Sequence, residues 1–306
     1  APESPPPAAY LDLFRTLTRR YAQRLGQDLI SLAAHIARTR TAPITVVSLA
    51  RAGTPIGALL TRALTGRFEV EARHYSISII RDRGIDRNAL RHLLRTAGRP
   101  AAGLVFVDGW TAKGVITAEL KSALAHWNRT EPEWLDDRLY VLSDIGGTAD
   151  LAASYEDYAI PSGILNATVS GLVSRSVLNH QIGPDDFHGC VYYEGFAAAD
   201  HSTWFLDQIA GTFDSVQAQE LRPEAQATRR SQTQAWLRSC QARHGILDLN
   251  LIKPGVAEAT RVLLRRVPEH LLVRDPADPD VRHLLGLAQA RGVPVSAAAG
   301  MPFRAA

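Results

Sequence analysis

The chain has little cysteine and no long apolar run, and both absences narrow its class. Two cysteines in 306 residues, Cys190 and Cys240, are too few for a disulfide framework, so a reducing, cytoplasmic setting is expected. No apolar stretch approaches the ~20 residues that a membrane-spanning helix needs. Residues 1–9 form a Pro-rich leader, expected to be flexible, without the basic and apolar regions of a signal peptide. A membrane-embedded or secreted protein is therefore not expected.

The chain also lacks an excess of charge of one sign. Its formal net charge is +3, and charged residues make up 21% of it, mostly interspersed, so large-scale disorder is not expected. A net charge this small is no argument for nucleic-acid binding by itself. No His, Cys and Asp cluster has zinc spacing, and no internal repeat is visible. The length and the 46% apolar content suit about two globular domains.

Short β-branched runs alternate with helical patterns through the first half of the chain. Strands are predicted at residues 44–50, 75–80, 104–107 and 139–143. Helices are predicted at residues 10–38, 56–64 and 115–127. This alternation indicates an α/β fold, a three-layer, mostly parallel sheet, whose ligands bind at the carboxyl ends of the strands.

Residues 103–114 are the most informative stretch. An apolar run ends on Asp108, and a short loop of Gly, Thr and Lys follows before a predicted helix. Backbone N–H groups at a helix start favour an anion, and small residues let that anion approach closely. A ribose 5-phosphate would fit this turn, with Asp108 holding ribose hydroxyls. An ordinary strand-to-helix turn is the other interpretation.

Two more loops follow strands. Arg51 ends the first strand and precedes a small loop and a helix that Pro55 favours. Residues 81–86 form a charged, Gly-containing loop that is expected to be mobile.

Together these loops resemble those of a type I phosphoribosyltransferase. The pyrophosphate, flexible and ribose-phosphate loops would be residues 48–54, 73–86 and 107–114. More closely, the chain resembles the phosphoribosyltransferase-like proteins of bacterial tellurium-resistance and stress operons, some of which are labelled cysteine proteases. In these proteins a domain similar to Pelota and L7Ae-type RNA-binding proteins follows. The narrower resemblance rests on residues 48–57, 160–166, 170–175 and 187–189.

The resemblance implies Mg²⁺-dependent transfer of a phosphoribosyl group from phosphoribosyl pyrophosphate to an unidentified nitrogenous acceptor, giving a nucleotide- or nucleoside-like metabolite in a stress response. Asp108 would hold the ribose hydroxyls and the metal. Arg81 and Arg83 would close over the pyrophosphate as catalytic cations. The phosphates would be bound by Arg51, Ala52, Gly53, Thr54, Gly109, Thr111, Ala112, Lys113 and Gly114.

The transferase motif is incomplete, because Gly109 stands where such enzymes carry a second acid. This substitution favours an alternative, a non-catalytic nucleotide- or RNA-binding stress protein. In the transferase-like domain, residues 10–213, a hood at about 150–180 would cover the acceptor. The acceptor candidates in a predicted helical stretch are Asn166, Ser170 and Arg175. A helix cap and close helix packing are the other interpretation of these residues.

The rest of the chain is predicted to form a polar helical linker, residues 214–244, and a Pelota/L7Ae-like α/β domain, residues 245–306. Helices are predicted at 256–265 and 280–290, with strands at 271–273 and 293–295. The candidate RNA contacts are Lys253, Gly255, Glu258 and Arg261. Ala257 replaces the usual Asn of this class, so a fold relative without an RNA role is the second interpretation. A homodimer is also expected, since transferases of this type often dimerise.

A cysteine hydrolase is the rival enzyme class. Cys190 follows His188 by two residues, and alternate residues of a strand share one face. A nucleophilic cysteine needs a base within hydrogen-bond reach. The other interpretation is an inert, buried cysteine. Cys240 lies in the polar linker helix and has no evident partner.

Overall fold

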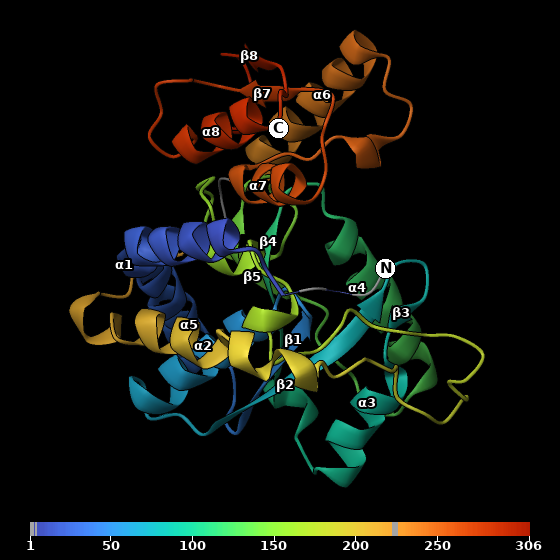
Figure 1. Ribbon diagram of the computed structural model, residues 1–306. Helices are drawn as coiled ribbons and strands as arrows, with labels where there is room; N and C mark the ends of the chain where they lie inside the picture. The colour runs from blue at the N-terminus through green and yellow to red at the C-terminus, as the bar shows by residue number, and fades with distance from the viewer. Residues whose placement is uncertain (1–2, 4, 222–225) are drawn as a thin grey trace.

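A six-stranded sheet lies at the centre of the computed structural model, which describes residues 3, 5–221 and 226–306 (Figure 1). The strand order is β3-β2-β1-β4-β5-β6, and every neighbouring pair is parallel except β2 and β3. The strands are β1 (Ile44–Ala50), β2 (Ala72–Ile80), β3 (Gly84–Ile85), β4 (Leu104–Thr111), β5 (Leu139–Asp144) and β6 (Leu151–Ser154). The expected mostly parallel α/β sheet is confirmed.

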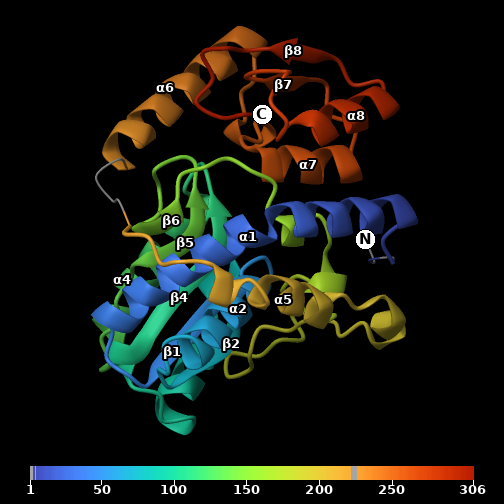
Figure 2. The ribbon, with the colours of Figure 1, turned by 90° about the vertical axis from the view of Figure 1, so that its left-hand side faces the viewer.

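Helices cover both faces of this sheet (Figure 2). One face packs against α1 (Ala8–Thr39), α2 (Thr54–Gly66) and α5 (Ser202–Ala210). The other face packs against α3 (Arg87–Arg91), the π-helix η1 (His92–Thr96) and α4 (Val115–Thr130). Successive residues of β1 alternate between the two cores, with Val46 in the first and Val47 in the second, as the two-residue period of a strand requires.

Strand β4 is longer than the sequence pattern predicts. It continues to Thr111, because Trp110 and Thr111 pair with Ser143 and Asp144 of β5. The ladder satisfies backbone groups that a loop would leave to water or a ligand. Asp108 therefore lies inside a strand, and the connection to α4 is reduced to residues 112–114. The predicted phosphate-sized loop over residues 108–114 is wrong in its extent.

The helix predicted after residue 163 does not form. Gly171 and Leu172 have φ values of 75° and 60°, which end a right-handed helix. The segment instead makes isolated antiparallel bridges, Val173 to Tyr192 and Val177 to Gly189. Short 3-10 turns occur at η2 (Ala101–Gly103), η3 (Pro161–Gly163), η4 (Ala167–Val169), η5 (Glu194–Ala199) and η6 (Phe213–Ser215).

The C-terminal part, residues 226–306, lies above the sheet edge and α1 (Figures 1 and 2). Its elements are α6 (Gln226–His244), η8 (Leu249–Leu251), α7 (Val256–Arg265), β7 (Leu271–Val273), α8 (Arg282–Ala290) and β8 (Val295–Ala297). β7 and β8 pair in parallel. Residues 1, 2 and 4 of the expected leader and 222–225 of the expected linker lie outside the described residues. Within the described ranges, no helix is long and apolar enough to cross a bilayer.

A buried carboxylate joins the two parts. Asp157 accepts the backbone N–H groups of Val256 and Arg304, each at 2.7 Å, although burial raises its pKa to about 6. Gly255 has a φ of 98°, and a Cβ there would lie 2.5 Å from Ile145 Cδ1. Gly255, an expected RNA contact, is therefore required by the packing of this junction.

Candidate functional site

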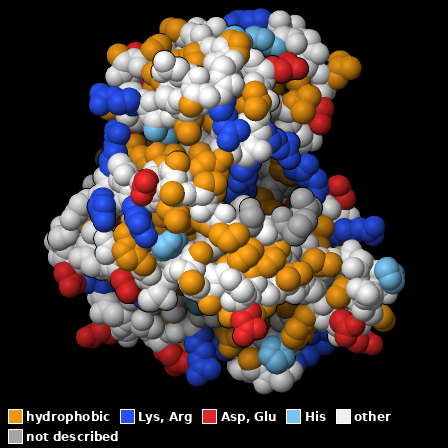
Figure 3. All heavy atoms as spheres, viewed as in Figure 1, with side chains coloured by type: hydrophobic (Ala, Val, Ile, Leu, Met, Phe, Trp, Pro, Cys, Tyr) orange, Lys and Arg blue, Asp and Glu red, His pale blue; other side chains and the backbone are white. Residues whose placement is uncertain are grey.

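A cleft of about 720 Å³ opens between the carboxyl ends of β1 and β4, the 162–175 segment and α7. We call it the central cleft. Figure 3 shows a hollow below the C-terminal part, with Lys and Arg side chains on its rim. Its position agrees with the expectation that a parallel sheet binds ligands at the carboxyl ends of its strands.

The central cleft brings together candidates to which the sequence assigned different roles. The predicted site residues that line it are Arg51, Ala52, Asp108, Asn166, Ser170, Arg175, Glu258 and Arg261. Others line a second cavity along α4, namely Arg81, Arg83, Lys113 and Gly114. Neither lining includes Gly53, Thr54, Gly109, Thr111, Ala112, Lys253 or Gly255. The predicted constellation is thus divided between two cavities.

Arg51 already has an anionic partner from its own chain. Its guanidinium lies 2.5 Å from Glu3 Oε1 and donates to the Val173 carbonyl oxygen at 3.0 Å. The second Glu3 oxygen accepts the Ala167 N–H at 3.3 Å. A carboxylate is therefore held inside the central cleft by an arginine and a backbone donor. The sequence contains no pattern that could have predicted this role of Glu3.

Asp108 is partly buried at the floor of the cleft. Burial raises its pKa to about 7, against the opposing influence of the Gly109 N–H and of Arg261. The Gly109 N–H donates to Asp108 Oδ1 at 2.8 Å. A Cβ on Gly53 would lie 3.1 Å from the same oxygen, so glycine lets the loop after β1 approach this acid.

Two expected RNA contacts on α7 face the sheet. Glu258 Oε1 accepts hydrogen bonds from Trp110 Nε1 at 3.3 Å and from Arg261 at 2.8 Å. The Arg261 guanidinium carbon also lies 6.0 Å from the centre of the Trp110 ring, within the range of a cation–π contact. Trp110 was not among the predicted site residues. The one feature of the sequence that could have indicated Trp110 was its position within the predicted ribose-phosphate loop.

Arg265 is a second residue that sequence reasoning missed. It lines the central cleft with Arg51 and Arg261. Although part of its side chain is exposed, burial of its guanidinium and the nearby Arg261 and Arg51 cations lower its pKa to about 10. The only signal for it was the basic run at the end of the predicted helix.

Lys113 and Thr111 are engaged by protein groups. Lys113 Nζ donates to the carbonyl oxygens of Leu249 and Ile252, each at 3.0 Å. Burial, followed by the neighbouring Lys253, lowers the Lys113 pKa to about 8. Thr111 is buried, with its hydroxyl 3.0 Å from that of Thr148. Lys113 therefore ties the C-terminal part to α4 and does not share a cavity with Arg51.

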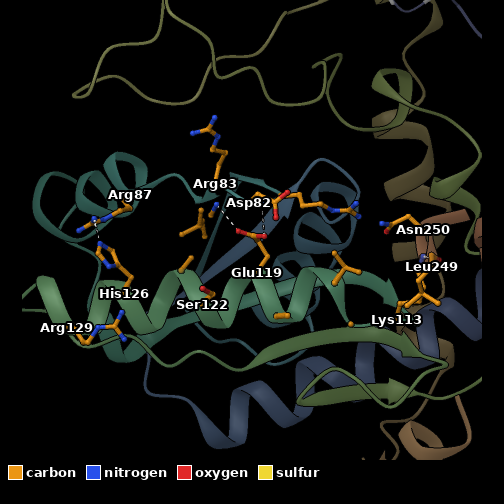
Figure 4. A pocket seen from close by; sticks show the side chains of 17 residues that line it. Asp82, Arg83, Arg87, Lys113, Glu119, Ser122, His126, Arg129, Leu249 and Asn250 are labelled. Carbon is orange, nitrogen blue, oxygen red and sulfur yellow. Dashed lines mark hydrogen bonds between the residues drawn. The ribbon is translucent and has the colours of Figure 1, made fainter. Parts of the chain in front are cut away.

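The loop predicted to be mobile is anchored (Figure 4). Glu119 of α4 accepts the backbone N–H groups of Asp82 and Gly84, each at 2.9 Å. The loop also contains β3, which pairs with β2. Arg81 and Arg83 of this hairpin line the α4 cavity.

The residues around Asp108 do not make a metal site. No three His, Cys, Asp or Glu side chains gather closely enough to hold an ion anywhere in the described ranges. Glu258, the acid whose charge acts on Asp108, is occupied by Trp110 and Arg261. Asp108 alone is a poor fit to Mg²⁺, which prefers several oxygen ligands in octahedral geometry.

Cys190 and His188 lie in an extended segment away from the sheet's core. Gly189 and Val191, the two residues that flank Cys190, form hydrogen bonds with Val177 and Ser174 of an antiparallel neighbouring segment. Cys190 is exposed, whereas Cys240 is buried, and burial raises the Cys240 pKa. The inert interpretation therefore suits Cys240 better than Cys190.

His188 is held by two contacts with the sheet side of the molecule. Its Nδ1 lies 2.8 Å from Ser78 Oγ on β2. Its backbone N–H donates to Asp86 Oδ2 at 2.7 Å, and the other oxygen of Asp86 caps α3 through Ala89 N–H at 3.0 Å. His188 and Cys190 are two residues apart in this segment, and among the described residues no hydrogen bond joins their side chains.

Three large apolar side chains close to Cys190 in the sequence are exposed. Phe187, Val191 and Tyr192 are 52%, 49% and 63% exposed.

Comparison with known proteins places most of the chain in one family. Residues 1–210 match the family described as "Tellurite-like stress resistance cysteine protease StiP", and residues 231–306 match the PELOTA RNA binding domain. "Cysteine protease StiP" of Acinetobacter baylyi is 39% identical over an alignment that covers 99% of this chain and 82% of that protein.

Solved structures similar to this chain include hypoxanthine phosphoribosyltransferases. One from Trypanosoma cruzi is 16% identical, with a TM-score of 0.34, over 45% of this chain and 82% of that one. Another, of the same protein in complex with the product IMP, is 16% identical, with a TM-score of 0.32, over 44% and 72%. At these values the similarity carries no conclusion about ligand or reaction.

The family assignment corrects the expected enzyme class. The expectation of a phosphoribosyltransferase that uses phosphoribosyl pyrophosphate and Mg²⁺ is wrong, because the family and its relative are named as a cysteine protease, which is a hydrolase. The expected link to tellurium resistance and stress and the expected Pelota-like domain are confirmed. The chain belongs to the StiP family of tellurite-like stress resistance cysteine proteases.

Proposed function

We propose that this chain is a cysteine hydrolase in which Cys190 is the nucleophile and His188 is its base. The observation that carries the proposal is the position of His188, which is fixed by Ser78 and Asp86 and lies two residues before an exposed cysteine. The name of the family and of its relative supports the same class.

The contacts of His188 suit a general base. If Nδ1–H donates to Ser78 Oγ, the Nε2 lone pair is left to accept the thiol proton of Cys190. The thiolate then bonds to the carbonyl carbon of the substrate, the C–N bond breaks, and the amine leaves with the proton from His188. Water hydrolyses the resulting thioester and restores the thiol.

A donor for the developing oxyanion is available at the nucleophile itself. The backbone N–H of Cys190 has no acceptor within the part of the chain that the structure describes, whereas those of His188, Gly189 and Val191 are all bonded. A free backbone N–H beside the reacting carbon can stabilise negative charge on the carbonyl oxygen. Phe187 and Tyr192 would supply apolar contact for the peptide.

The test compares the two cysteines. Cys190→Ser should lower hydrolysis of a fluorescence-quenched casein by at least ~100-fold, as expected when a nucleophile is removed. Cys240→Ser, at the buried cysteine, should leave the rate within about twofold. Iodoacetamide should inactivate the Cys240→Ser protein. It should not change the already low rate of the Cys190→Ser protein. Equal rates for wild type and Cys190→Ser would exclude Cys190 as the nucleophile.

We also propose that the C-terminal part binds RNA, which the match of residues 231–306 supports. Of the expected contacts, Glu258 and Arg261 are engaged with Trp110, and Gly255 is packed against Ile145. Lys253 remains as the candidate cation. Binding of a 20-nucleotide single-stranded RNA in a fluorescence-anisotropy titration tests this second activity, and an unchanged signal at ~50 mM salt would reject it.

A further inference from the structure

We infer that the cavity along α4 is a groove that binds the sugar–phosphate backbone of single-stranded RNA. We call it the α4 groove; its charged and polar residues include Arg81, Arg83, Arg87, Lys113, Arg129 and Asn250. The inference deepens the RNA-binding proposal by naming where the strand lies, and it is independent of the hydrolase proposal.

Positive charge in the α4 groove is not balanced by the acids that line it. Those acids are Asp82 and Glu119, and both Glu119 oxygens accept backbone N–H groups of the hairpin. Arg83 and Arg129 are exposed and have no hydrogen-bond or ion-pair partner for their guanidinium groups among the described residues. Arg81 is in the same situation. Cations that are free of partners in a groove attract a polyanion.

The shape of the groove suits a strand. Figure 4 shows Lys113 and Asn250 at one end of α4, His126 and Arg129 towards the other, and Arg83 between them on the hairpin. The 16 residues of α4 span about 24 Å at 1.5 Å per residue. Such a length accommodates a run of several nucleotides, comparable to the smaller sites of single-strand binding proteins.

The floor of the groove favours contact with phosphates over reading of bases. It is made of small side chains, Gly84, Ala118, Ser122 and Ala123, which allow close approach of a backbone. The described lining residues include no Phe, Tyr or Trp, so there is no aromatic platform on which bases would stack. Binding is therefore independent of sequence and strongly dependent on salt.

The groove also reaches the region that matches an RNA-binding domain. Leu249 and Asn250 of η8 close one end, and they belong to the matched residues 231–306. Lys113 holds η8 in place by donating to Leu249 and Ile252. A strand that contacts the C-terminal part at η8 would continue along the α4 groove.

The test uses the full chain and a 20-nucleotide poly(U) RNA in anisotropy titrations. Arg83→Glu with Arg129→Glu should weaken binding at least ~10-fold at 50 mM salt and make the slope of log K against log [salt] shallower by about 1.4, since each phosphate contact contributes about 0.7. The control pair, Arg19→Glu with Arg67→Glu, makes the same charge change at exposed arginines outside the groove and should change binding by less than about twofold.

Four outcomes would overturn the inference. Equal losses in both pairs would mean that only net charge matters. If Lys253→Glu lowers RNA affinity and the groove pair does not, the protein binds RNA at a site other than the groove. Displacement of the RNA by polyglutamate at equal charge concentration would show that the groove binds polyanions in general and not RNA in particular. If wild type binds no RNA at all, the RNA-binding proposal and this inference both fall, while the hydrolase proposal is untouched.

Discussion

The Arg51 guanidinium and the Glu3 carboxylate lie 2.5 Å apart at the carboxyl end of β1, so the chain fills part of its own central cleft. Both side chains are 17% exposed, which screens the pair less than a fully solvated ion pair. Five arginines line this cleft, namely Arg51, Arg175, Arg261, Arg265 and Arg266. Glu3 is thus one of the anions that balance them.

The first prediction follows from this pair. Glu3→Gln should lower stability by about 1 kcal/mol, because it leaves Arg51 without its anion, and added sulfate should restore the loss by binding in its place. Differential scanning fluorimetry with and without sulfate measures both effects. Glu269→Gln, at an exposed acid without a partner among the described residues, serves as the control. The same sulfate response in both variants would mean that Arg51 does not bind the added anion.

Ser78 is predicted to act on catalysis through His188. Ser78→Ala removes the oxygen 2.8 Å from Nδ1, so the imidazole loses the contact that orients it. We expect kcat for casein hydrolysis to fall about tenfold with little change in KM, and its pH profile to shift. Ser76→Ala, two residues earlier on β2 and paired with Thr54, should keep the wild-type profile. An unchanged pH profile in Ser78→Ala would argue against His188 as the base.

Buried Asp28 should make the protein less stable as pH rises. Burial raises its pKa to about 6 from an ordinary value of 3.8, against the opposing hydrogen bond from Tyr158. The folded state therefore holds a proton that the unfolded state has released between about pH 4 and pH 6. The free energy of unfolding should fall by about 3 kcal/mol across that window.

Asp28→Asn isolates this contribution, since the amide cannot titrate. Urea unfolding at pH 4, 5 and 6 should give a flatter pH dependence for Asp28→Asn than for wild type. Asp12→Asn, at an exposed position of the same helix, should retain the wild-type slope. A parallel decline in Asp28→Asn and wild type would assign the pH dependence to other groups, such as Asp157, whose pKa is also raised to about 6.

Gly255 is predicted to be essential for the junction of the two parts. Gly255→Ala would place a Cβ 2.5 Å from Ile145 at a φ of 98°, and we expect a loss of about 2–3 kcal/mol. Gly286→Ala, within α8 and with nothing within 4 Å of its added Cβ, should instead stabilise by about 0.5–1 kcal/mol. Urea unfolding gives both values. Similar values for the two variants would show that the Gly255 contact relaxes without cost.

The elements with strong local patterns were predictable. β1, α7 and β7 have the bounds that the sequence pattern predicts, because a β-branched run and an amphipathic period depend on neighbours along the chain. The extent of β4 was not predictable. Its last residues are strand because β5 lies beside them, and the Gly, Thr and Lys around them resemble a loop.

The family and the hydrolase alternative also came within reach of the sequence, through the motif segments and the pair His188 and Cys190. The predicted phosphoribosyl transfer was wrong. A sequence that resembles a phosphate-binding loop does not show whether its side chains are already bonded to other parts of the protein. Lys113 is engaged with Leu249 and Ile252, and both are more than 130 residues away along the chain. Such contacts are decided by how separate elements pack.

By itself, then, the sequence determined the α/β class, many of the strands and helices and the residue types available for chemistry, because these follow from local periodicity and composition. Only the tertiary structure decided that Arg51 faces Glu3, that Glu258 and Arg261 face Trp110, and that Arg81 and Arg83 line a different cavity. The physical reason is that long-range packing decides which side chains meet. A side chain that is hydrogen-bonded or ion-paired within the protein is less available to bind a ligand.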